Sequence, residues 1–401
     1  MDAPNINTFE PAYGESFEYT PLPDIPAGSR IGVVGAGAFG GWAALHLLRS
    51  GYDVTLYDAW GSGNSRSSSG DETRVIRSTY GKNELYFKMN ARSLQLWREH
   101  ERYFAKQVLI NAGVLWFCYK EKTPLVDDSI PFSRKYGMEY VYLSTAELRK
   151  RYPHVNSADL DHAYLDPYGG YLLARESCQE VLKLFVSEGG KYIQREIKPL
   201  RKDGSDINEI ALSDGSRETA DAFLFACGSW LPLMFPNELQ RIITCTRQEV
   251  YYFGVPAADS SAFDAMPVWI DADGKDFYYG IPGNSLRGFK IGVDKRGATF
   301  NPTSGERTPV EAVLKEARQF LSHRFPALRY APLIEARVCP YENSPSGNFI
   351  FDMLPGTRNV FVLGGGSGHG FKHGPALGEL VAGVFTGKER VPDAFRLARY
   401  Q

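Results

Sequence analysis

Three glycines and one aspartate near the start of the chain have the spacing of a phosphate-binding turn. Gly35, Gly37 and Gly40 form the pattern GxGxxG between an apolar segment, residues 31–34, and a segment with helical apolar spacing. Such glycines permit a tight turn, a close approach of the backbone to a pyrophosphate, and close helix–strand packing. Asp58 ends a second apolar segment, where a carboxylate holds ribose hydroxyl groups and disfavours the 2′-phosphate of NADP. We therefore expect a bound dinucleotide, and this motif leaves NAD and FAD open.

The elements that position this turn alternate between strand and helix at the start, middle and end of the chain. Strands are expected at 31–34, 54–57, 221–227, 348–352 and 360–363, and helices at 41–49, 82–106, 175–188, 308–324 and 375–385. Residues 108–142 and 248–300 alternate aromatic and β-branched residues, which favours antiparallel strands. We expect an α/β fold with α+β insertions, in which a Rossmann-like nucleotide-binding domain is joined to an antiparallel-sheet substrate domain.

The domain boundaries follow from these changes of pattern. An N-terminal arm is expected at 1–28, because this part is polar and has no periodicity. The nucleotide-binding domain is discontinuous and takes 29–108, 158–247 and 335–401, whereas the substrate domain takes 109–157 and 248–334.

Composition excludes several classes of function. The 401 residues include 45 basic and 47 acidic side chains, so no net field attracts nucleic acid or an anionic membrane. No apolar run of about eighteen residues predicts a membrane span, and the N-terminal segment does not resemble a signal peptide. Five cysteines without a CxxC pair favour a reducing compartment. We expect a cytoplasmic protein without nucleic-acid or membrane partners.

Five further segments resemble motifs of the monomeric sarcosine oxidase family. They are DETRVIR at 71–77 (GDTR-x-x-R in the family), YYGIP at 278–282 with GFKIG at 288–292 (YYG-x-P and GLKLG), VCPY at 338–341 (Cys-x-Tyr), and GSGHGFK at 366–372 (SGHGFK). This family belongs to the D-amino-acid-oxidase-like FAD-dependent amine oxidases and includes fructosyl amino acid and pipecolate oxidases. The resemblance runs from about residue 30 to 390, with the motifs in the same order.

The resemblance implies a role for several residues. Cys339 would be joined covalently to the flavin 8α-methyl group, and Lys290 would lie near flavin N5, where a fixed cation stabilises superoxide as O2 is reduced. Lys372 and Arg77 would bind a substrate carboxylate. From the residues alone, Lys290 is equally well a surface lysine. For Lys372 and Arg77 the alternative is a salt bridge to a nearby acid such as Asp71 or Glu72.

The complete set of expected site residues falls into two groups. The catalytic group is Lys290, Arg77, Lys372, Tyr279, Tyr341 and Asp294, in which the two tyrosines shape the cavity. The cofactor-binding group is Gly35, Gly37, Gly40, Asp58, Thr73, Arg74, Cys339, Gly366, Gly368, Gly370 and Lys372. The late glycine turn would supply backbone N–H groups and a helix dipole near flavin N1 and the C2 carbonyl. No metal is expected, although His369 and His373 are four residues apart.

One position departs from the family pattern. Four residues after Lys290 the sarcosine enzymes have a histidine, and this chain has Asp294. An anion there argues against sarcosine and favours an amine with an additional cationic or polyhydroxy group.

The expected reaction is oxidation of a secondary or N-substituted amino acid by a monomeric, FAD-dependent enzyme of this family. Hydride passes from the amine carbon to flavin N5, an imine forms, and O2 becomes H2O2. Three alternatives stay open: a flavin dehydrogenase with another acceptor, an NAD-dependent dehydrogenase, and a flavin-bearing subunit without turnover of its own.

Overall fold

Two of the four β-sheets in the described part of the chain set the positions of the functional residues. The computed structural model describes residues 22–23, 25–200, 206–272, 276–283 and 287–400. Most of the expected arm at 1–28 lies outside the described residues. Near its end, Leu22 is buried, and the backbone N–H of Ile25 donates to the carbonyl of Phe385.

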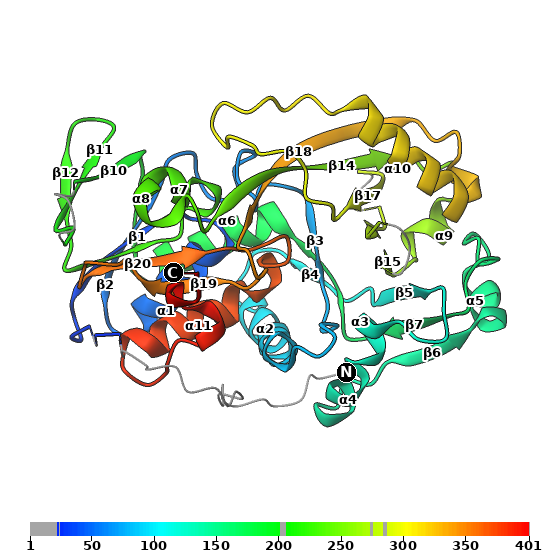
Figure 1. Ribbon diagram of the computed structural model, residues 1–401, viewed down its shortest axis with the longest axis horizontal. Coiled ribbons are helices and arrows are strands. Elements are labelled where there is room, and N and C mark those ends of the chain that lie inside the picture. The colour runs from blue at the N-terminus through cyan, green and yellow to red at the C-terminus, as the bar shows by residue number, and fades with distance from the viewer. Residues whose placement is uncertain (1–21, 24, 201–205, 273–275, 284–286, 401) are drawn as a thin grey trace.

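The first sheet has six strands and lies in the left half of Figure 1. Its order is β19-β20-β13-β1-β2-β9, and every neighbouring pair is parallel except β19 with β20. The strands are β1 (Arg30–Val34), β2 (Asp53–Asp58), β9 (Lys191–Gln194), β13 (Ala222–Phe225), β19 (Ile350–Met353) and β20 (Val360–Gly364). Apolar runs such as AFLF in β13 are typical of parallel strands covered on both faces. The five strands expected for this domain are confirmed.

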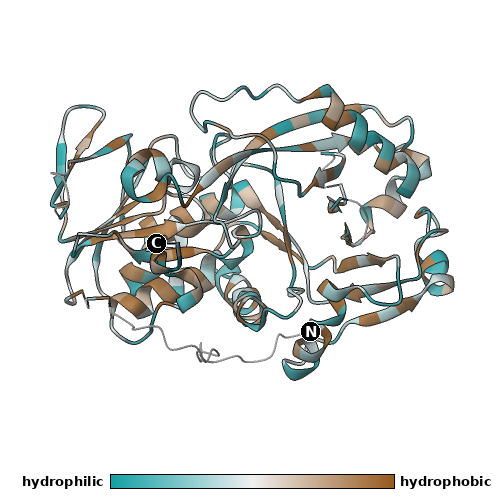
Figure 2. Cartoon of the chain, in the orientation of Figure 1, coloured by the Kyte–Doolittle hydropathy of each residue, from teal (hydrophilic) through white to brown (hydrophobic). Residues whose placement is uncertain are grey.

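Helices and a small sheet cover the two faces of this six-stranded sheet. α1 (Ala38–Arg49) packs against α6 (Ala174–Ser187) and α11 (Gly374–Phe385), and α2 (Glu84–Glu101) packs against α11. The opposite core contains α7 (Leu231–Met234), α8 (Pro236–Leu239) and the sheet of β10 (Ile197–Leu200), β11 (Glu209–Leu212) and β12 (Arg217–Thr219). Hydrophobic residues therefore concentrate on the sheet and on α11 (Figure 2).

The second large sheet has eight strands in the order β18-β14-β17-β16-β15-β5-β7-β6. Two long strands, β14 (Thr244–Phe253) and β18 (Leu333–Asn343), pair antiparallel and reach from the six-stranded sheet into the right half of Figure 1. The others are β5 (Val114–Cys118), β6 (Val141–Ser144), β7 (His162–Asp166), β15 (Val268–Asp271), β16 (Tyr278–Ile281) and β17 (Phe289–Val293). One face packs against α10 (Glu311–Arg324), where Trp269, Phe289 and Leu321 are buried together.

Short elements connect the two large sheets. β3 (Thr73–Ile76), β8 (Gly170–Leu173) and β4 (Leu109–Ile110) form a small antiparallel sheet, and α5 (Thr145–Arg151) and α9 (Ser260–Asp264) lie beside the eight-stranded sheet. The strands expected within 108–142 are confirmed at β5 and β6, but the sequence did not predict the two short helices between them, α3 (Pro124–Asp127) and α4 (Ile130–Lys135). Pro124 and Pro131 occupy first-turn positions, where the missing N–H of proline has no effect on the helix.

The observed fold is mixed α/β with antiparallel additions, as the sequence predicts. We retain the division into a nucleotide-binding and a substrate domain as a proposal, with β7 and β18 assigned to the substrate domain because they pair in the eight-stranded sheet. Within the described part of the chain, no helix combines the length and the apolar character that crossing a bilayer demands.

Candidate active site

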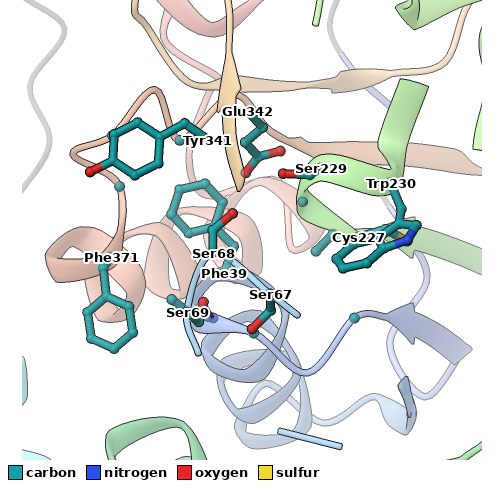
Figure 3. Close-up of a pocket in the computed structure, with 18 of the residues that line it drawn as sticks. Phe39, Ser67, Ser68, Ser69, Cys227, Ser229, Trp230, Tyr341, Glu342 and Phe371 are labelled. Atoms are coloured by element: carbon teal, nitrogen blue, oxygen red, sulfur yellow. Dashed lines mark hydrogen bonds between the residues drawn. The ribbon is translucent and has the colours of Figure 1, made fainter. Parts of the chain in front are cut away.

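A long cavity opens at the carboxyl ends of β1, β13 and β20 and extends to the eight-stranded sheet. Ligands of open α/β sheets bind at this end of the strands. The expected site residues that line it are Gly35, Gly37, Asp58, Arg74, Arg77, Tyr279, Asp294, Tyr341, Gly366, Gly368, Gly370 and Lys372. Four others, Gly40, Thr73, Lys290 and Cys339, lie behind the lining. Figure 3 shows part of the cavity, with Tyr341 and Phe371 on one side and Trp230 on the other.

The first glycine turn requires glycine at two positions. Gly35 has φ +105°, and a Cβ there would lie 2.4 Å from the carbonyl oxygen of Ala226. A Cβ on Gly40 would lie only 1.8 Å from the carbonyl oxygen of Gly35, so α1 packs directly on the turn. Gly37 precedes α1, and the cavity therefore meets the positive end of this helix, as a pyrophosphate requires.

Asp58 holds the neighbouring loop in place. Its Oδ2 accepts from the N–H of Ala36 at 2.8 Å, and its Oδ1 accepts from the N–H groups of Trp60 and Gly61 at 2.9 and 2.8 Å. Burial raises the pKa of Asp58, and these three N–H groups oppose the increase. Since a carboxylate has about four acceptor positions, one remains for a ribose hydroxyl group.

The serine-rich loop after β2 also forms part of the cavity, through Ser67, Ser68 and Ser69. Ser69 Oγ accepts from the N–H of Ala38 at 3.2 Å, and Ser68 Oγ donates to the carbonyl of Pro340 at 2.7 Å. The loop therefore joins the start of α1 to β18. Its Gly/Ser composition is a visible sequence signal, but it is equally typical of a linker.

Strand pairing brings the family-related residues to one face of the eight-stranded sheet. Lys290 lies opposite Tyr252 in β14, and Cys339 lies opposite Gln248 in the same strand. Residues 248 and 252 are separated by an even number, so both pairs share a face. Tyr341 follows Cys339 by two residues and shares this face. The face opposite α10 is therefore the one that contacts the cavity.

Lys290 forms a buried ion pair with Asp71. Its Nζ donates to Asp71 Oδ2 and, at 2.9 Å, to the carbonyl of Thr73. Asp71 also accepts from Arg74 Nη1 at 2.6 Å and from Tyr252 Oη at 2.7 Å. Burial would raise the pKa of Asp71, but the charges of Lys290 and Arg74 outweigh it and hold this pKa below its usual range. Arg337 also approaches Asp71, at 3.7 Å, so three cations surround this one carboxylate beside the cavity.

Cys339 is a buried thiol in a positive environment. Its side chain is 7% exposed, and burial raises its pKa, whereas the charges of Arg74, Lys290 and Arg307 lower it. Two residues before Cys339 in β18, Arg337 Nη1 lies 2.9 Å from Glu72 Oε1. The acids at 71 and 72 therefore pair with Lys290, Arg74 and Arg337 and not with Arg77 or Lys372.

Arg77 and Lys372 line the cavity as two neighbouring cations. Arg77 stacks on the ring of Tyr80 at 4.8 Å and donates to the carbonyl of Thr79, and Lys372 Nζ donates to the carbonyl of His369 at 2.7 Å. Neither forms an ion pair with a carboxylate within the described ranges. Burial and the charge of Arg77 lower the pKa of Lys372 well below its ordinary value, so a carboxylate would stabilise the charged lysine.

Asp294 lies at the same end of the cavity and is only partly buried. Its Oδ1 pairs with Arg296 Nη1 at 2.6 Å, and it would lie 3.4 Å from a Cβ on Gly368. The acid that replaces the family's histidine therefore faces the late glycine turn.

Sequence reasoning missed three prominent cavity residues. Trp60 and Trp230 lie with ring centroids 4.9 Å apart, and Arg66 is positioned 5.6 Å from the Trp60 ring. Glu342 lies in β18, three residues after Cys339, and is also part of the lining. Single tryptophans and a strand glutamate have no motif that marks them, so only their positions in space reveal them.

The cavity, its two glycine turns and the helix start at Gly37 define a dinucleotide-binding protein. The chain belongs to the FAD dependent oxidoreductase family, whose model matches residues 30–384. It is therefore an FAD-dependent oxidoreductase, and this decides between the two dinucleotides that the glycine motif left open. The glycine cradle and the helix start fit FAD.

Similar proteins support the expected family resemblance. Monomeric sarcosine oxidase from Bacillus sp. (strain B-0618) is 27% identical over 366 residues, which cover 89% of this chain and 92% of that protein. N-methyl-L-tryptophan oxidase from Salmonella dublin is 28% identical over 375 residues, which cover 92% and 98%. The resemblance to the sarcosine oxidase family is confirmed.

Solved structures share the fold at lower identity. L-proline dehydrogenase from P. horikoshii has a TM-score of 0.80 at 20% identity and covers 94% of this chain and 98% of its own. Fructosyl peptide oxidase from E. terrenum has a TM-score of 0.77 at 20% identity and covers 92% of each chain. The expected fold class is therefore confirmed.

Proposed function

We propose that this chain is an oxidase of secondary or N-substituted amino acids. The observation that carries the proposal is the pair Arg77 and Lys372, two cavity cations without a carboxylate partner among the described residues. Two such cations match the carboxylate of an amino acid. The names of the sarcosine and N-methyltryptophan oxidases support the same substrate class.

The cavity residues would bind and orient the amine. Arg77 and Lys372 hold its carboxylate, and the rings of Tyr279 and Tyr341 exclude water around the amine. Exclusion of water disfavours the ammonium form, and the neutral amine has the free lone pair that the oxidation requires. When bound, FAD would accept a hydride from the amine carbon and pass two electrons to O2, which gives an imine and H2O2. Lys290 and Arg74 would supply positive charge for the reduction of O2.

Product analysis tests this proposal. Purified protein should convert an N-methyl or other N-substituted amino acid in air, with equal amounts of O2 consumed and H2O2 released. The corresponding primary amino acid should react far more slowly. Turnover with an artificial electron acceptor and none with O2 would instead identify a dehydrogenase.

The dehydrogenase is the second candidate, and one observation favours it. The Nζ of Lys290 already donates to Asp71 and to two oxygens of Thr73, so its charge is partly neutralised. A neutralised cation stabilises superoxide less, which would favour an acceptor other than O2.

As with the named monomeric relative, we propose that the enzyme acts as a monomer.

We predict that Cys339 carries the flavin through a thioether. Formation of this bond removes the thiol hydrogen and one 8α-methyl hydrogen, and O2 accepts both with two electrons as H2O2. Acid precipitation of the purified protein should leave the yellow flavin in the pellet, whereas Cys339→Ala should release it to the supernatant. Cys245→Ala, which changes another buried thiol, should retain it. Free flavin from the unaltered protein would refute the link.

Asp294 is predicted to select the substrate. Replacing its anion by the family's histidine should raise kcat/KM for small N-methyl amino acids relative to amines with a second cationic or polyhydroxy group. We expect a change in this ratio of about tenfold, the size of one lost ion pair of about 1.4 kcal/mol. Arg296→Gln is the control, because it keeps the anion at 294 and removes its ion-pair partner together with a hydrogen bond to the carbonyl of Ser367. An unchanged ratio would show that Asp294 does not contact the substrate.

A further inference from the structure

Glu342 is a buried carboxyl group in the cavity that no cation of the described residues neutralises. It is 7% exposed, and its Oε2 has no hydrogen-bond partner in the part of the chain that the structure describes. Burial raises its pKa to about 7, and the N–H groups of Gly366 and Gly365 oppose this increase. Among the ion pairs of the described residues, none includes Glu342.

Two other buried acids of this protein have a cation that neutralises them. Glu249 pairs with Arg247 at 2.8 Å, and Asp352 pairs with Arg396 at 3.2 Å and accepts from the N–H of Leu397. Asp166 also has no cation among the described ion pairs, but it does not line the cavity. A buried carboxylate without a cation is unfavourable for folding. The position of Glu342 is therefore better explained by a ligand than by the stability of the fold.

Three glycines lie close to this carboxyl group. A Cβ on Gly364 would lie 3.1 Å from Glu342 Oε2, one on Gly366 would lie 3.3 Å from Oε1, and one on Gly228 would lie 3.9 Å from Oε1. The same position on Gly366 lies 3.8 Å from the ring of Phe39, the second residue of α1. Figure 3 shows the carboxyl group beside Ser229, on the opposite side of β18 from Tyr341.

Glu342 lies between the phosphate-binding turn and Cys339, which marks the expected site of the flavin ring. Gly364 ends β20 and Gly228 follows β13, and β13 is the neighbour of β1, which leads into the phosphate-binding turn. In the other direction, Cys339 precedes Glu342 by three residues of strand, or about 10 Å. In a dinucleotide that extends from the turn to the flavin-ring site, the chain that joins the ring to the phosphates would pass beside Glu342.

The chemistry of the carboxyl group selects the same part of the cofactor. A pyrophosphate would repel it, and the isoalloxazine ring presents mostly acceptors toward its surroundings. The ribityl chain carries three hydroxyl groups, which donate to a carboxylate oxygen. We propose that Glu342 is a cofactor-binding residue that accepts a hydrogen bond from a ribityl hydroxyl group of FAD. This inference depends on FAD and not on the identity of the amine.

Cofactor analogues that lack single hydroxyl groups provide the test. Apoprotein carrying Cys339→Ala, which keeps the cofactor dissociable, is titrated with FAD and with its 2′-, 3′- and 4′-deoxyribityl analogues, and quenching of flavin fluorescence gives Kd. With Glu342 present, at least one analogue should bind about tenfold or more weakly than FAD. In the Glu342→Leu variant, the Kd of FAD itself should rise by a similar factor. The Kd values of FAD and of that analogue should then lie within twofold of each other.

Two further variants keep the result interpretable. Glu342→Gln preserves the shape of the side chain and an acceptor oxygen. It should therefore retain part of the penalty, which is the factor by which the analogue binds more weakly than FAD, even if the leucine variant does not fold. Asp352→Asn alters a buried acid outside the cavity and should retain the full penalty. The proposal is overturned if every analogue binds as tightly as FAD with Glu342 present. It is also overturned if the penalty is the same with and without the carboxyl group.

Discussion

Lys290→Met is expected to slow the reoxidation of the reduced enzyme by O2 on the order of 100-fold, the loss typical of one preorganised electrostatic group. Lys290, Arg74 and Arg337 surround Asp71, so removal of Lys290 lowers the positive charge beside the cavity. Reduction by the amine should change by less than about threefold, because Lys290 does not line the cavity. Stopped-flow absorbance of the flavin measures the two half-reactions separately.

Lys295→Met serves as the matched control for this prediction. Lys295 lies just beyond β17, its side chain is 57% exposed, and it pairs with Asp276 at 3.6 Å. Its removal changes the total charge equally but leaves the buried group around Asp71 intact. Equal slowing of both half-reactions by Lys290→Met would remove Lys290 from its proposed role. An unchanged O2 reaction would show that Lys290 does not assist the reduction of O2.

Arg77→Gln is expected to raise KM for the amino acid at least about 30-fold, since loss of one partner of a buried charge pair costs about 2 kcal/mol or more. Arg77 already lies beside Lys372 in the cavity, so the variant loses the forked half of the proposed carboxylate site. Steady-state kinetics with an N-methyl amino acid measures this change. Arg77→Lys should give an intermediate KM, because it retains the charge and loses the fork.

A substrate without a carboxylate separates this role from a structural one. Arg77 also stacks on Tyr80 and Trp116, at 4.8 and 5.3 Å, so its removal affects packing as well. For a secondary amine that lacks the carboxylate, the parent enzyme and Arg77→Gln should have similar kcat/KM. Equal loss with both substrates would assign Arg77 to packing and not to the substrate.

Local patterns were sufficient to predict the nucleotide-binding half of the fold. The turn at Gly35 and Gly40 is specified by sterics between neighbouring residues, and the helix that follows has its own apolar periodicity. The same holds for β20 and α11 around the late glycine turn. In contrast, α3 and α4 were missed because each is under seven residues long, too short for periodicity to distinguish a helix from a strand.

The partners of the charged residues could not be predicted from the sequence. Lys290 and Asp71 are 219 residues apart, and their contact depends on the pairing of β17 with β14 and on the position of β3. The resemblance placed Lys290 at the active site, but only the structure reveals the acid that shares its charge. Glu342 was missed for the same reason, because the sequence does not show which side chains surround a carboxyl group in the folded chain.

Anaerobic titration of the purified yellow protein with amines is the most direct test of the proposed amine oxidation. An N-methyl, cyclic or fructosyl amino acid should bleach the visible absorption of the flavin in proportion to the amine added, and admission of air should restore the colour with release of H2O2. If dithionite bleaches the flavin but no amine of these classes does, the proposed reaction is wrong.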